Sequence, residues 1–161
     1  DAVTYFVRDV WPLVRARAPE ARFTVTGGTG KVDVSILAAA PAVTFTGYLP
    51  TVAPAVQRHT ALVVPLREGG GTRLKILEAM ALGVPVISTS KGAEGLPVRH
   101  GENILIADQP AQMADTIRTL FDNPALRATL AANARALVER EYDWSAIAQQ
   151  LLRLIDRMKK S

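Results

Sequence analysis

Short apolar runs and longer amphipathic segments alternate along this chain of 161 residues. Apolar runs that end in glycine, proline or a polar residue predict strands at 22–26, 43–46, 61–66, 85–88 and 103–107. Helical spacing of apolar residues predicts helices at 3–18, 32–40, 51–59 and 72–82, and from 110 onward with breaks near 123–124 and 142–143. Strands that alternate with helices in this way predict an α/β fold with a doubly wound, Rossmann-like parallel sheet.

Individual residues refine two of these helices. Pro12 lies inside the first helix and should kink or restart it, because proline cannot donate a helical hydrogen bond. Thr72 is suited to be the N-cap of the helix at 72–82, since its hydroxyl can accept from a free backbone N–H. Gly83 then falls where a left-handed residue can end that helix.

Composition limits the classes of protein to consider. A hydrophobic content of 48% over 161 residues fits one globular domain, and no apolar run approaches the roughly 18 residues of a membrane span. The net charge of +4 is spread over helical segments without aromatic–basic alternation, so we expect no nucleic-acid partner. The two histidines lack metal-ligand spacing, and the absence of cysteine agrees with a cytoplasmic location. Since the first residue is Asp rather than Met, we expect a piece of a longer protein.

The segment 65–88 has the most informative chemical pattern. It combines the end of a buried strand, a glycine-rich loop, a helix and a second buried strand. Backbone N–H groups without side chains in their way would lie at the helix N-terminus, where phosphate oxygens can bind, at Gly69, Gly70, Gly71 and Thr72. The alternative is a flexible turn in which the glycines only permit positive φ.

Two cations follow the glycines. Positive side chains are mildly unfavourable at a helix N-terminus, so Arg73 and Lys75 are candidate phosphate partners. The alternative is a solvated first helical turn. A third candidate is Tyr48, which follows Gly47 and could border a nucleotide base or instead pack on the domain surface. Further candidates to line the same cleft are Ser90, Lys91 and Glu94.

These segments together resemble the C-terminal, donor-binding domain of the retaining GT-B glycosyltransferases called group 1, or family 4-like. The resemblance rests on Gly-Gly-Gly-Thr-Arg-Leu-Lys at 69–75, Ser-Lys-Gly-Ala-Glu-Gly-Leu at 90–96, Val-Thr-Phe-Thr-Gly-Tyr-Leu at 43–49 and Tyr-Asp-Trp-Ser at 142–145. It covers nearly the whole chain. It implies that residues 1–161 form a single nucleotide-sugar-binding domain, the C-terminal half of a GT-B architecture, whose first strand lies before Asp1.

The resemblance also implies an activity for the full-length protein. The expected reaction is a metal-independent transfer, without a cofactor, of a sugar from a nucleoside diphosphate sugar to a glycan or lipid-linked acceptor. Cell-surface or exopolysaccharide synthesis is the expected context, in the cytoplasm or at the cytoplasmic membrane face through peripheral association. The acceptor site would belong to a missing N-terminal domain, so the chain alone should not turn over.

The resemblance assigns roles to two carboxylates. Glu78 matches a glutamate that holds the nucleotide ribose, because a carboxylate can accept hydrogen bonds from a vicinal diol. Its alternative is a surface salt bridge with Lys75, three residues earlier. Many relatives carry an earlier glutamate that contacts the donor sugar, but Gly70 occupies that position here. Glu68 is therefore a candidate substitute and the candidate catalytic residue.

Other functions remain open on the sequence alone. A sugar-nucleotide epimerase can share the two-domain architecture, and a non-catalytic nucleotide-binding or interaction module would explain the missing glutamate. A flavodoxin-like receiver would need an acidic cluster at the strand ends, which are apolar or glycine-rich here.

Overall fold

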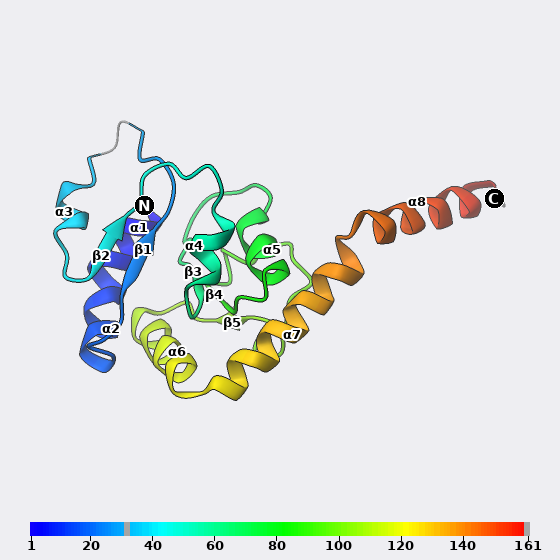
Figure 1. Ribbon diagram of the computed structural model, residues 1–161. Helices are drawn as coiled ribbons and strands as arrows, with labels where there is room; N and C mark the ends of the chain where they lie inside the picture. The colour runs from blue at the N-terminus through cyan, green and yellow to red at the C-terminus, as the bar shows by residue number, and fades with distance from the viewer. Residues whose placement is uncertain (31–32, 160–161) are drawn as a thin grey trace.

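The structure is a computed structural model that describes residues 1–30 and 33–159 (Figure 1). Its strands are β1 (Phe23–Val25), β2 (Val43–Phe45), β3 (Leu62–Val64), β4 (Val86–Ser88) and β5 (Leu105–Ile106). Its helices are α1 (Ala2–Tyr5), the π-helical turn η1 (Phe6–Val10), α2 (Trp11–Arg17), α3 (Ser35–Ala38), α4 (Ala53–Gln57), α5 (Leu74–Ala81), α6 (Pro110–Asp122), α7 (Pro124–Glu141) and α8 (Trp144–Lys159). This order confirms the predicted Rossmann-like α/β fold.

The strands form two parallel sheets. One contains β1 and β2, with Phe23 opposite Val43, and the other contains β3, β4 and β5 in that order, with Leu62 opposite Val86. Figure 1 shows the smaller sheet beside α1 and α2, and the larger one close to α4 and α5. The doubly wound sheet predicted from the sequence is thus divided between β1 and β3.

A cavity of about 830 Å³ lies between the two sheets, and residues of both β1 and β3 line it. Phe23 donates its backbone N–H to Ala42 on the β2 side, and Leu62 donates to Pro85 on the β4 side, each at 2.9 Å. Because backbone groups alternate in direction along a parallel strand, the next residues, Thr24 and Val63, direct theirs away from the paired strand. Each sheet therefore presents one free edge to the cavity.

The first helix is distorted as the sequence predicted. Phe6–Val10 form a wide π turn between α1 and α2. Pro12 is the second residue of α2, and its ring excludes the carbonyl of Arg8 from the ordinary hydrogen-bond position. The turn leaves Phe6 and Trp11 both buried, and each ring contacts Phe23 of β1, at centroid distances of 4.4 and 5.8 Å.

The C-terminal end of α5 lies where the sequence predicted it, but the N-terminal end does not. Gly83 adopts φ 71° after the helix and donates to the carbonyl of Met80, as expected of a left-handed terminator. Thr72 was expected to be the N-cap, but the helix begins two residues later and Arg73 occupies that position without a side-chain cap bond. The predicted helix at 32–40 is present only as α3, and Val32 lies outside the described residues.

Two apolar clusters support the sheets. The first joins the N-terminal helix and α6 to both sheets, through Phe6, Trp11, Ile87 and Met113 among others. The second holds α5 and α7 on the larger sheet through Ile76, Met80, Val86, Ile104 and Ala134. Beyond them α8 extends away from the body of the molecule (Figure 1). Within the described residues, no helix is both long and apolar enough to cross a membrane.

Candidate functional site

The glycine-rich loop connects β3 to α5 and is open to solvent. Residues 69–72 are all exposed. Gly69 and Gly71 adopt φ of 106° and 98°, which side-chain-bearing residues rarely do. A Cβ built on Gly69, Gly70 or Gly71 would meet no neighbouring atom within 4 Å. The glycines thus permit a left-handed path and leave room for a ligand beside the backbone.

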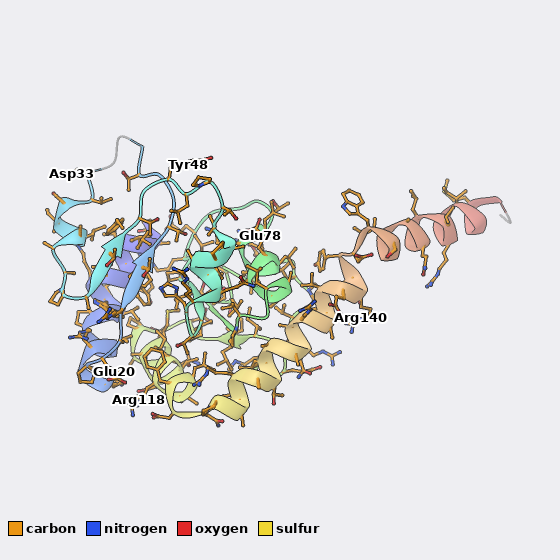
Figure 2. The ribbon with its side chains drawn as sticks, viewed as in Figure 1. Glu20, Asp33, Tyr48, Glu78, Arg118 and Arg140 are labelled. Carbon is orange, nitrogen blue, oxygen red and sulfur yellow. The ribbon has the colours of Figure 1, made fainter. Side chains whose placement is uncertain are left out.

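Lys75 and Glu78 lie on α5 directly after this loop. Both side chains are exposed, and among the described residues neither has a hydrogen bond or ion-pair partner. The surface salt bridge between Lys75 and Glu78, left open by the sequence, is therefore not formed. Figure 2 shows Glu78 on α5. Contact between Glu78 and a ribose stays a prediction, as does any role for Glu68, which is exposed in the same loop.

The side chain of Arg73 points into the protein. Its side chain is 7% exposed, and Nη2 donates to the backbone carbonyl of Lys91 at 2.9 Å. Glu94 Oε2 lies 3.6 Å from the same nitrogen, and the buried Nε–H has no acceptor. The guanidinium thus connects the glycine loop to the loop after β4. A direct contact with phosphate, expected from the sequence, stays untested.

The loop after β4 is held to the end of β3 by buried hydroxyls. Ser88 Oγ lies 2.9 Å from the carbonyl oxygen of Thr89 and 3.3 Å from that of Val64. Thr89 donates its backbone N–H to the Val64 carbonyl at 3.2 Å and its hydroxyl to the carbonyl of Leu66. Gly92 packs so closely here that an added Cβ would lie 2.4 Å from Ser88 Oγ and 2.8 Å from the Val64 carbonyl oxygen. Sequence reasoning missed this cluster, although three hydroxyl residues after an apolar strand were a visible signal.

The same loop carries the other cleft candidates. Ser90 is occupied, because its N–H and Oγ both bond to the Asp108 carboxylate at 2.7 Å. Lys91 Nζ donates to Glu94 Oε2 at 2.7 Å. That hydrogen bond and the positive charge of Lys91 lower the pKa of Glu94, with a smaller contribution from Arg73. The cation of Lys91 is therefore already paired with a carboxylate of its own loop.

Gly47 and Tyr48 lie on the smaller sheet. Gly47 accepts a hydrogen bond from Gly27 N–H at 3.0 Å, which joins the turns after β1 and β2. The side chain of Tyr48 is 80% exposed and projects outward from the loop (Figure 2). Packing of this ring on the domain surface, the alternative to a contact with a base, is therefore not observed. Contact with a base stays a prediction.

The two histidines do not belong to a catalytic or metal-binding cluster among the described residues. His59 Nε2 lies 2.9 Å from Thr24 Oγ1, and His100 Nδ1 accepts from the backbone N–H of Ile106. In the part of the chain that the structure describes, no three histidine or acidic side chains gather as metal ligands. Chemically, the site offers exposed backbone donors in the glycine loop, together with the cation of Lys75 and the carboxylate of Glu78, neither of which is paired within residues 1–30 and 33–159.

Solved structures define the fold class. Residues of this chain superpose on HepE from Anabaena, solved with UDP, with a TM-score of 0.75 and 21% identity, covering 92% of this chain and 44% of that one. TarM from S. aureus gives a TM-score of 0.78 at 22% identity and covers 94% and 32%. A C-terminal domain of a group 1 glycosyl transferase from Francisella tularensis gives 0.71 at 24%, covering 89% and 80%. The fold is the Rossmann-like α/β fold found in GT-B glycosyltransferases.

The sequence itself gives the family. Residues 1–123 match the family described as Glycosyl transferases group 1, so this chain belongs to the group 1 glycosyl transferases. It is 32% identical over 112 residues to a phosphatidyl-myo-inositol mannosyltransferase of Mycobacterium leprae, covering 68% of this chain and 29% of that protein. It is 35% identical over 79 residues to an uncharacterized 44.6 kDa protein in the cps region of Klebsiella pneumoniae, covering 49% and 20%. The chain thus spans less than a third of the length of either relative.

Proposed function

We propose that this domain binds the nucleoside diphosphate of a sugar donor in a glycosyltransferase. The observation that supports it best is the unpartnered Glu78 carboxylate, one helical stretch after an exposed glycine loop at the N-terminus of α5. The loop amides and Lys75 would bind the diphosphate, and their donors would stabilise its charge as it departs. Glu78 would accept hydrogen bonds from the ribose.

The experiment is isothermal titration of the chain with UDP, GDP and ADP. Glu78→Ala should weaken binding by about 1–3 kcal/mol, the loss expected for a charged hydrogen-bond partner. Glu139→Ala is the matched control, because Glu139 is an exposed helical glutamate that forms a surface ion pair with Arg135 on α7. If the wild-type chain binds none of the three nucleotides, the proposal fails; if it binds and Glu78→Ala binds equally, only the ribose contact fails.

The class of acceptor is inferred from the relatives rather than from the site. Relatives named as mannosyltransferases of phosphatidyl-myo-inositol, and one from a cps region, support a glycan or lipid-linked acceptor and a cell-surface role. The family favours transfer over epimerisation or a purely binding role. The proposed site of action is the cytoplasm, with peripheral association of the full-length protein with the membrane face.

We also propose that this domain is one half of a longer two-domain enzyme and lacks turnover alone. The cavity between β1 and β3 supports this, because it offers two facing free strand edges. A parallel strand in the cavity would end beside Ala2 and Val3, which also line it, and would lead directly into α1. Residues preceding Asp1 are the proposed source of this strand.

A further inference from the structure

The buried guanidinium of Arg73 has more hydrogen-bonding capacity than it uses. A guanidinium has five N–H donors. Here Nη2 reaches one carbonyl, Nε–H is buried without an acceptor, and the neighbouring carboxylate of Glu94 stays 3.6 Å away. Burying a cation with such incomplete pairing is unfavourable for stability. A role other than stabilising the fold would account for its position.

The two segments that Arg73 joins differ in how firmly they are held. Hydroxyl–carbonyl bonds fix the start of the loop after β4 to the end of β3, and Gly92 is packed against them. The glycine loop, in contrast, has no atom within 4 Å of the position of a Cβ on Gly69, Gly70 or Gly71. Arg73 links the far end of the open loop, after the glycines, to the fixed loop through the Lys91 carbonyl.

We propose that Arg73 is a positioning residue of the donor site. By holding the Lys91 carbonyl it keeps the glycine-loop amides in one arrangement before a ligand arrives, which lowers the ordering cost of binding. The inference rests on the proposed binding of a nucleoside diphosphate. It differs from the sequence expectation, in which Arg73 itself touches phosphate.

Glu94 completes the arrangement. Its Oε2 accepts from Lys91 Nζ at 2.7 Å and lies 3.6 Å from Arg73 Nη2, so one carboxylate oxygen faces both cations. The carboxylate is more than half exposed and the guanidinium is buried. Glu94 therefore offsets part of the charge of Arg73 from the solvent side and also pairs with the Lys91 side chain.

The test compares Arg73→Met with Arg99→Met. Methionine has no charge and fills much of the buried space. Arg99 is an exposed control that forms a surface ion pair with Glu102. In Arg73→Met, hydrogen exchange should accelerate in residues 66–74 and 89–96 but not in β4. The Kd for whichever of UDP, GDP and ADP the wild type binds should rise about tenfold. Arg99→Met should match the wild type.

Arg73→Lys serves as the second variant, because it keeps the charge and can still reach a carbonyl. Arg73→Lys should restore part of both the exchange protection and the affinity. If Arg73→Met is globally unstable and exchanges faster throughout, Arg73→Lys becomes the variant that tests the proposal. Lost affinity with unchanged exchange would overturn the proposal, since Arg73 would then contact the ligand directly. Faster loop exchange with unchanged affinity would overturn it as well.

The two proposals can fail separately. A wild-type chain that binds none of the nucleotides removes the proposed function, whatever Arg73 does. Hydrogen exchange without ligand still reports whether Arg73 holds the glycine loop, and unchanged exchange in Arg73→Met overturns that link.

Discussion

β4 and β1 are parallel strands of equal length with opposite surroundings. All three residues of β4 are buried, whereas all three residues of β1 are only half-buried. The difference follows from neighbours, because β4 pairs with β3 and β5 while β1 pairs with β2 alone. β3, on the other side of the cavity, likewise has one paired side and is only partly buried. Burial in this domain thus depends on strands being covered along both edges.

The largest expected effect compares a core residue from each region. Val86→Ala in β4 should lower the free energy of unfolding by about 2.5 kcal/mol, because it leaves a new cavity around a fully buried side chain. Val25→Ala in β1 should lower it by only about 1 kcal/mol, because Val25 lines an existing cavity. Urea denaturation measures both. Equal losses would show that the cavity is filled in solution.

A smaller effect is expected from completing the sheet. Six residues rich in valine and isoleucine, placed directly before Asp1, should pair with both free edges and raise the unfolding temperature by roughly 4–8 °C, equivalent to about 2 kcal/mol. The amides of Thr24 and Val63 should become protected from hydrogen exchange at the same time. The difference in burial between β4 and β1 would then disappear.

The control is the same added segment with proline at alternate positions, which cannot supply the ladder. An equal temperature gain from both versions would count against strand insertion. A chain without the addition that is dimeric, with Thr24 and Val63 already protected, would show that a second copy fills the cavity.

The smallest effect concerns the loop after β4. The hydrogen bond from Lys91 holds the pKa of Glu94 below its ordinary value. The stabilisation from this pair is therefore fully present above the ordinary value and is lost as the pH falls through the lower folded value. A carbon-detected NMR titration should give a lowered pKa for Glu94 in the wild type. In Lys91→Met the pKa should move back toward the ordinary value, and an unchanged pKa would exclude this pairing in solution.

Most of the element order could be predicted from the sequence because it depends on local patterns. The apolar run before Ser88 indicated a buried strand, and Gly83 ended α5 as expected. The division of the sheet could not be predicted, since it depends on which strands lie next to one another rather than on local periodicity. Thr24 and Val63 look like ordinary strand residues whether or not a strand lies beside them.

The candidate site was predictable in its backbone and less so in its side chains. The open glycine loop and the exposed positions of Lys75 and Glu78 follow from local composition and helical spacing. The inward turn of Arg73 does not, because its acceptor belongs to Lys91, on a separate loop. The fit of Gly92 against Ser88 is also a tertiary contact without a local pattern beyond the hydroxyl residues themselves.

The wide turn before Pro12 fixes the rotational phase of the N-terminal helix. Phe6 and Trp11 are five residues apart, a spacing that would separate their directions on a regular α-helix but lets both rings reach Phe23 here. The indole N–H of Trp11 also donates to the carbonyl of Pro41 at 2.8 Å, at the start of the smaller sheet. The helix is thus anchored at one end, and at its other end Ala2 and Val3 lie on the wall of the cavity between the sheets.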